Sequence, residues 1–288
     1  YSTEFNSNDL SAGYNYEDYD FELVGTRPNY KQSTKELNNI RINAVDTGIT
    51  LYNYSDLSEL DTQENEYYLE IYHGQTVNIS MDYFEDSTST SLTPDKGYFS
   101  WSGQSQTDLI PDYVHAGNYV LEFDGSLADD TKEYTVKLTI GRENYSHFLN
   151  YEFTVNVKEI PTTINGDPDL GILINKELYV NKEYDFIFSY KNNLTGQAIT
   201  ELDANNQYFW EKEGTGTEGS GTFEVIGSNL VLDMDTENLS PGTYSINGFI
   251  QREFHEIKFI TISLIINERE VTFELLSGSN DKVSSPQG

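Results

Sequence analysis

Two stretches of this chain, about 110 residues apart, carry the same landmarks in the same order. An alternating run at 76–84 corresponds to one at 183–190, and the two tryptophans of the chain, Trp101 and Trp210, take matching positions. Further on, 134–143 aligns with 244–253 without a gap. A series of landmarks at nearly constant spacing indicates that one domain has been duplicated.

Each copy consists of short runs that alternate apolar and polar residues, separated by turn sequences such as those at 95–97 and 240–242. A period of two is typical of half-buried strands, and no helical pattern exceeds two turns. The apolar residues are rich in Tyr (22) and Phe (15), which suit pleated sheets. These features predict an all-β chain of two tandem immunoglobulin-like Greek-key β-sandwich domains, with a barrel as the lesser alternative.

We expect the first sandwich at 37–158 and the second at 159–275, with an extended N-terminal segment at 1–36 and a C-terminal tail at 276–288. The N-terminal segment is aromatic, acidic and absent from the repeat. Three interpretations remain open: a flexible tail, a remnant strand of an earlier domain, or a strand donated to an open sheet edge of a neighbouring copy. In the third, Tyr16, Phe21 and Leu23 would contact the other subunit.

The formal charge is −31, from 48 acidic and 17 basic residues. Because phosphate binding needs clustered Lys and Arg, nucleic acid and anionic membranes are excluded as general partners. The absence of cysteine excludes disulfides and thiolate metal sites. No apolar stretch reaches the roughly 18 residues of a spanning helix, so we expect no membrane insertion of this segment. A secretion signal or an anchor would lie outside it.

The second copy carries a family likeness. Its run from Gly227 to Thr236 and from Leu239 to Ile246, followed by an Arg-Glu-aromatic hairpin, resembles the immunoglobulin-like repeats of large archaeal surface proteins, including those of Asgard archaea. The first copy resembles the same segment at 134–145, although 129–133 departs from its small-Gly-Thr pattern. The resemblance spans roughly residues 75–275 and implies surface display, wall or filament building, or adhesion.

Acidic loops are the place to look for a cation. Calcium takes carboxylate and carbonyl oxygens, which loops between β-domains supply, so we name Asp167, Asp169, Asp233 and Asp235 as candidate calcium ligands. No cofactor is required by this interpretation, and Ca²⁺ is the one that it allows. The four histidines show no paired spacing for zinc.

The two tryptophans could offer a platform for a sugar, but their matching positions within alternating strands favour a core role in each sandwich. No nucleophile elbow, phosphate loop or nucleotide fingerprint occurs. A Ser/His/Asp triad is not excluded by spacing, because such triads are assembled in space. The repeated sandwich accounts for nearly all of 75–275, so we expect no enzyme.

Five N-glycosylation sequons occur, a number that chance alone would produce in so Asn-, Ser- and Thr-rich a chain. Their positions suit attached N-linked glycans: Asn78 takes the outward phase of its strand and three others fall in predicted loops. The acceptors are Asn53, Asn78, Asn144, Asn193 and Asn238.

These observations lead to an extracellular structural protein at the cell surface, a subunit that self-associates into a filament or surface layer through its N-terminal segment. The alternative is a monomeric adhesin or glycan-binding module on a longer stalk. Deletion of residues 1–36 is expected to leave folded monomers that no longer assemble.

Overall fold

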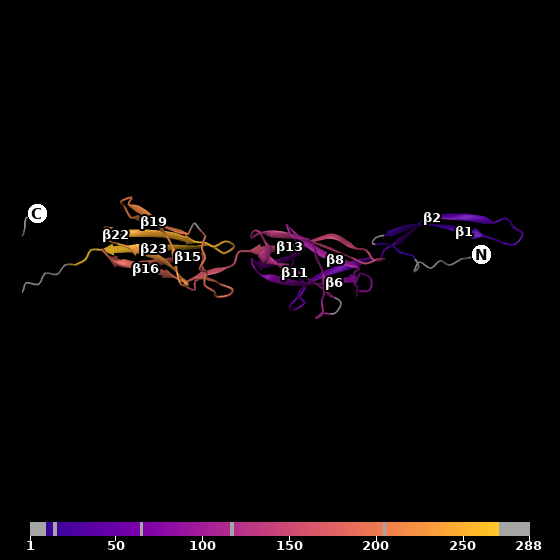
Figure 1. The fold of residues 1–288 in the computed structure, drawn as a ribbon, viewed down its shortest axis with the longest axis horizontal. Coiled ribbons are helices and arrows are strands. Elements are labelled where there is room, and N and C mark those ends of the chain that lie inside the picture. Colours follow the sequence, from indigo (N-terminus) through magenta and orange to yellow (C-terminus); the bar gives the residue numbers. More distant parts are fainter. Residues whose placement is uncertain (1–9, 14–15, 64–65, 116–117, 204–205, 271–288) are drawn as a thin grey trace, which may run out of the picture. The chain divides into compact units, whose positions relative to one another are not determined.

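The structure is a computed structural model that describes residues 10–13, 16–63, 66–115, 118–203 and 206–270. The chain divides into two compact units, Tyr1–Glu159 and Ile160–Gly288 (Figure 1). The regular structure of the described ranges is strand, apart from one 3₁₀ turn at Gly125–Leu127. None of it is a helix long and apolar enough to cross a membrane.

Unit 1 is a sandwich of two sheets. The first has the strand order β10-β11-β6-β3, with β7 beside β6, and the second has the order β4-β5-β13-β12-β8-β9. The strands are β3 (Thr47–Asn53), β4 (Thr62–Gln63), β5 (Glu66–Tyr72), β6 (Thr76–Glu85), β7 (Thr90–Ser91), β8 (Lys96–Trp101), β9 (Thr107–Asp108), β10 (Ile110–Pro111), β11 (Asn118–Asp124), β12 (Glu133–Gly141) and β13 (Phe148–Lys158).

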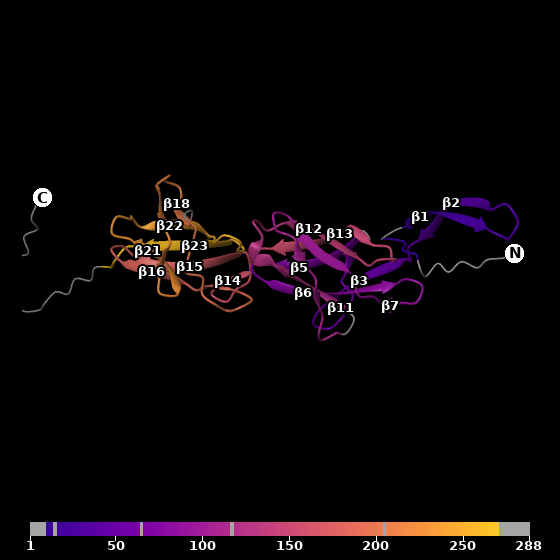
Figure 2. The ribbon, with the colours of Figure 1, turned by 45° about the vertical axis from the view of Figure 1, so that its right-hand side comes forward.

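Unit 2 repeats this plan (Figure 2). One sheet has the order β15-β23-β22-β18-β19 and the other the order β16-β21-β20, while β14 pairs with β17. The strands are β14 (Thr162–Ile164), β15 (Gly171–Tyr179), β16 (Glu183–Phe188), β17 (Tyr190–Asn192), β18 (Gln207–Lys212), β19 (Glu218–Thr222), β20 (Glu224–Ile226), β21 (Asn229–Asp235), β22 (Gly242–Ile250) and β23 (Lys258–Asn267).

The strand order confirms the immunoglobulin-like fold in both units. An early strand runs parallel to the last one, β5 beside β13 and β15 beside β23, whereas the other pairings are antiparallel. Several strands that follow one another in the chain, such as β5 and β6 or β11 and β12, belong to opposite sheets. That alternation is the Greek-key connection expected for this class of sandwich.

The tryptophan of each unit packs against the core of that unit. Trp101 lies on β8 and its ring packs 4.5 Å from that of Phe123 on the opposite sheet and 5.2 Å from that of Tyr134. In unit 2, Trp210 packs 5.8 Å from Tyr244. The core role predicted for both tryptophans is confirmed, although Trp210 is only half-buried.

The core tyrosine of each unit also donates a hydrogen bond to a backbone carbonyl four residues earlier, just before its own strand begins. The hydroxyl of Tyr134 donates to the carbonyl of Asp130 at 2.9 Å, and that of Tyr244 donates to the carbonyl of Ser240 at 2.8 Å. This arrangement is the tyrosine corner of immunoglobulin-like domains. The gap-free match of 134–143 with 244–253 therefore reflects a shared packing device.

The N-terminal segment differs from the extended one expected for 1–36. Strands β1 (Tyr16–Gly25) and β2 (Ser33–Asn43) pair with each other as an antiparallel hairpin, so the expected boundary at residue 36 falls within β2 (indigo in Figure 1). Cross-strand apolar pairs such as Phe21 opposite Leu37 favour this pairing. Just before the hairpin, the backbone N–H of Ala12 donates to Oδ1 of Asn144 at 2.6 Å. The expected tail at 276–288 lies outside the described residues.

Candidate functional site

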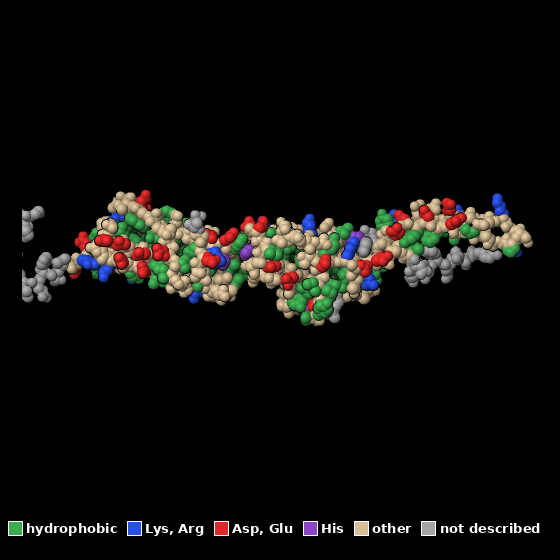
Figure 3. Space-filling view, viewed as in Figure 1, with side chains coloured by type: hydrophobic (Ala, Val, Ile, Leu, Met, Phe, Trp, Pro, Cys, Tyr) green, Lys and Arg blue, Asp and Glu red, His purple; other side chains and the backbone are tan. Residues whose placement is uncertain are grey.

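The two most exposed large apolar side chains in the described part of unit 1 lie between β10 and β11: Tyr113 is 90% exposed and Val114 71%. We call residues 110–115 the apolar loop; it begins with β10, where Ile110 is 55% exposed. Hydrophobic side chains gather on the surface below β6 and β11 in Figure 3. The matching turn of unit 2 needs only Gly227 and Ser228 between β20 and β21. The apolar loop is therefore an addition to the repeated plan.

A buried carboxylate fixes the apolar loop. The side chain of Asp112 has no exposed surface, and its Oδ1 accepts the backbone N–H groups of Val114 at 2.8 Å and His115 at 3.0 Å. Its Oδ2 lies 2.7 Å from Nδ1 of His115. Burial alone would raise the pKa of Asp112, but the donors from His115 and Val114 outweigh it and hold the pKa below its usual value. The buried Asp112 carboxylate thus holds the backbone of the apolar loop in one conformation.

The same network brings a serine, a histidine and an aspartate together, as a catalytic triad would require. Ser80, however, has no exposed surface, and its Oγ donates to Oδ2 of Asp112 at 3.4 Å and not to the ring of His115. A nucleophile must face the substrate and bond to its base. The cluster therefore has the connectivity of a structural anchor.

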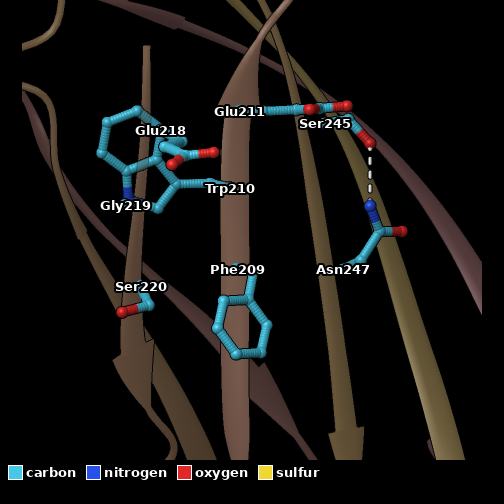
Figure 4. A pocket seen from close by; sticks show the side chains of 8 residues that line it. All are labelled: Phe209, Trp210, Glu211, Glu218, Gly219, Ser220, Ser245 and Asn247. Atoms are coloured by element: carbon cyan, nitrogen blue, oxygen red, sulfur yellow. Dashed lines mark hydrogen bonds between the residues drawn. The ribbon is translucent and has the colours of Figure 1, made fainter. Parts of the chain in front are cut away.

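Unit 2 carries a shallow groove on the outer face of the β15-β23-β22-β18-β19 sheet. Its volume is about 610 Å³, and its lining comes from β18, β19 and β22. Phe209, 53% exposed, lies on the middle strand between Ser220 and Asn247, its cross-strand partners (Figure 4). We call this the sheet-face groove; its lining residues are Phe209, Trp210, Glu211, Glu218, Gly219, Ser220, Ser245 and Asn247.

The residues expected to contact another subunit all lie on β1 but do not share one face. Tyr16 stacks on Arg41, whose guanidinium carbon lies 4.0 Å from the ring centroid. Phe21 lies 6.2 Å from the ring of Tyr19, and Leu23 is 43% exposed. Because side chains alternate along a strand, Phe21 and Leu23 share one face of the hairpin and Tyr16 lies on the other.

The candidate calcium ligands form two separate pairs in unit 2. Asp233 and Asp235 are exposed on β21, while Asp167 and Asp169 lie in the loop between β14 and β15. Within the described ranges, no three acidic or histidine side chains come close enough to hold a metal ion. Neither pair of candidate ligands therefore gains a third carboxylate or imidazole within the described residues.

A lysine occupies the oxygen-rich loop instead. The ammonium of Lys258 donates to the carbonyls of Pro168 at 2.6 Å and Asp169 at 3.0 Å, and lies 2.9 Å from the carboxylate of Glu256. The Lys258 side chain is only 1% exposed. Carbonyl and carboxylate oxygens are what Ca²⁺ would need, and here a built-in cation binds them.

Four of the five sequon asparagines are exposed, and Asn78 is the exception. Asn78 does face outward from β6, as predicted, but it is half-buried and its Oδ1 has neither exposed surface nor a hydrogen-bond partner. A glycosyltransferase needs access to the amide nitrogen of the same side chain. The exposed acceptors are Asn53, Asn144, Asn193 and Asn238.

No protein-family model matches the chain, and no curated protein matches it. Several solved structures are similar to the chain. The adhesin InvE of Yersinia pseudotuberculosis is 11% identical, with a TM-score of 0.29, over 75% of this chain and 58% of that one. The tandem immunoglobulin repeats of Dlar are 12% identical, with a TM-score of 0.23, over 78% of this chain and 100% of that one.

A 1.5-MDa bacterial ice-binding adhesin is 15% identical, with a TM-score of 0.27, over 87% of this chain and 74% of that one. Similarities at this level carry no further conclusion about this chain. The chain spans 58% of the length of the InvE structure. The activity of InvE therefore belongs to a longer molecule.

Proposed function

We propose that this chain is an extracellular structural protein of the cell surface that self-associates into a filament or layer. The observation that carries the proposal is the N-terminal hairpin. A two-stranded hairpin is at best marginally stable in water by itself, and most of β1 and β2 is exposed. An additional strand partner from a second copy would supply the missing support.

The receiving edge that fits best is β15. This strand is nine residues long and ends its sheet in the described part of the chain, with Leu173 68% exposed. A long exposed edge strand presents unpaired N–H and C=O groups to an incoming strand. Because the hairpin and β15 are different surfaces, the contact is heterologous, and it generates an open polymer when the rotation between copies does not close a ring.

The hairpin would add as a pair of strands. Donation of β1 alone, as the sequence suggested, would first separate it from β2, with which nine Cα pairs are in register. Adding the intact hairpin to an edge costs none of these pairings. Main-chain hydrogen bonds also suit a chain of charge −31, because they do not require the two acidic surfaces to attract each other.

In this proposal the chain has no catalytic role, requires no cofactor and carries N-linked glycans on its exposed sequons. Bound Ca²⁺ would act by screening repulsion between acidic subunits. Surface display is also what the resemblance to archaeal repeats implies.

Electron microscopy and light scattering of the purified chain test the proposal. Wild-type protein should form filaments or sheets, and a chain that begins after Asn43 should remain monomeric with both sandwiches folded. Leu173→Lys places a charge on the β15 edge and should weaken assembly, whereas Ile187→Lys, on the exposed β16 edge, should not. Polymers formed equally well without the hairpin would refute the proposal.

The second candidate function is a monomeric adhesin, favoured by the apolar loop of unit 1. Exposed, rigid aromatic and aliphatic side chains are typical of protein contact sites. Beads coated with the chain should bind cell-surface preparations through Tyr113 and Val114, and a Tyr113→Ser, Val114→Ser variant should bind them at least tenfold more weakly. Equal binding by this variant would eliminate the loop as the contact.

A further inference from the structure

We propose that the sheet-face groove of unit 2 binds a short neutral oligosaccharide. The groove joins an exposed aromatic ring, Phe209, to the side chains of Ser220, Ser245 and Asn247 on the two neighbouring strands. Sugar rings present an apolar C–H face together with hydroxyl groups, so they match an aromatic surface edged by hydrogen-bonding groups. The inference does not depend on self-association or on the apolar loop.

The polar groups of the groove are held in place before any ligand arrives. Asn247 Nδ2 donates to Ser245 Oγ at 3.1 Å, the bond drawn in Figure 4, and its Oδ1 accepts from Thr261 Oγ1 at 3.1 Å. The amide is thereby fixed in one orientation, with one N–H and one lone pair left over. A fixed donor and acceptor lower the ordering cost of binding a hydroxyl-rich ligand.

The row across the sheet sets the length of the ligand. Ser220, Phe209, Asn247 and Thr261 are cross-strand partners in succession on β19, β18, β22 and β23. Adjacent strands lie about 4.8 Å apart, so the row spans roughly 14 Å. Successive pyranose units of an extended glycan advance by about the spacing between adjacent strands. A row of this length therefore accommodates a few sugar units.

Glycine on β19 makes room for aromatic rings on the opposite, core-facing side of this sheet. A Cβ at Gly219 would lie 2.5 Å from the indole of Trp210, and one at Gly221 would lie 2.4 Å from the ring of Tyr208. The two aromatic rings fill the space that side chains on β19 would take. Trp210 therefore serves the core and also lines the groove, which a core role alone does not require.

Charge determines which glycans fit. Glu211 and Glu218 are both exposed and lie opposite each other on β18 and β19, and the groove lining contains no Lys or Arg. Carboxylates accept hydrogen bonds from neighbouring hydroxyls and repel acidic sugars. The chain as a whole, at −31, adds to that repulsion. The ligand class is thus neutral hexose or N-acetylhexosamine oligomers.

Calorimetric titration of the full chain with cellohexaose, the N-acetylglucosamine hexamer and mannohexaose tests this inference, with the galacturonic acid hexamer as the anionic comparison. We expect at least one neutral hexamer to bind with Kd at or below about 1 mM and the anionic hexamer not to bind. Phe209→Ala should weaken binding at least tenfold. Phe259→Ala, an exposed phenylalanine on the same sheet face outside the groove, should leave it unchanged.

A thermal melt of each variant separates lost binding from lost folding, and scattering of the same samples reports assembly independently. Exchange of both Glu211 and Glu218 for Gln should admit the anionic hexamer. Absence of binding by all three neutral hexamers, or equal losses for the Phe209 and Phe259 variants, would overturn the assignment.

Discussion

The buried ammonium of Lys258 offers the sharpest test of how unit 2 is held together. Methionine has nearly the same length and fills the same space, so Lys258→Met removes the charge without leaving a cavity. It also removes the donor to the carbonyls of Pro168 and Asp169 and leaves the Glu256 carboxylate, 31% exposed, without its cation. Breaking one side of a buried charged network costs about 3–5 kcal/mol. Because Glu256 is partly exposed and Pro168 and Asp169 are exposed residues, hydration offsets part of this cost and we expect about 2–4 kcal/mol.

Each unit contains one tryptophan, which gives an assay specific to unit 2. In a Trp101→Phe background, urea denaturation followed by Trp210 fluorescence reports only the second sandwich. With a denaturant slope of about 2 kcal/mol per M, the midpoint should fall by roughly 1–2 M.

Two comparisons make the result decisive. Lys137→Met breaks the exposed pair with Glu152 and should cost under about 0.5 kcal/mol when unit 1 is followed by Trp101. Adding Glu256→Gln to Lys258→Met should recover part of the loss. A Lys258→Met midpoint within 0.2 M of wild type would refute the view that the ammonium stabilises the loop.

Three further outcomes are expected. Tyr244→Phe removes the donor to the Ser240 carbonyl and should lower the stability of unit 2 by about 1–2 kcal/mol, measured by the same fluorescence transition. The lowered pKa of Asp112 means that its carboxylate stabilises unit 1 above about pH 4, the range of an unfolded aspartate, and that this contribution is lost as pH falls toward the folded pKa. Asp112→Asn should therefore flatten the dependence of the unit 1 midpoint on pH between about 2 and 5, and an unchanged slope would contradict this assignment. Mass spectrometry of native protein should find glycans on the exposed sequons and none on Asn78; a fully occupied Asn78 would show that its burial is no barrier.

Much of the fold could be predicted because its signals are local. Alternation along β6 and β16, the repeated tryptophans and the gap-free match around Tyr134 and Tyr244 each follow from one face of a strand meeting the core. The N-terminal hairpin could not be predicted in the same way. Its pairing joins Tyr19 to Ile40 across the turn, and a boundary at residue 36 cut through it because the second strand has few apolar residues before position 37.

The candidate sites were harder to anticipate because they depend on groups far apart in the chain. Four aspartates looked alike in sequence, yet one pair surrounds a loop whose carbonyls bind Lys258, some 90 residues away. The apolar loop had a partial signal, the Tyr-Val pair within a turn that its counterpart lacks. Only the fold places the Asp112 carboxylate beside Ser80 in the interior and exposes Tyr113 and Val114 at the surface.

The sequence by itself determined that this chain is two acidic, cysteine-free β-sandwiches. Periodicity and duplication can be recognised in the order of residues along the chain, without knowledge of tertiary contacts. The tertiary structure alone decided which side chains face one another. Phe209, Asn247 and Ser220 come from three strands, and their approach depends on strand order and register. A one-residue shift in that register would send each of them to the other face of the sheet, and the groove would not exist.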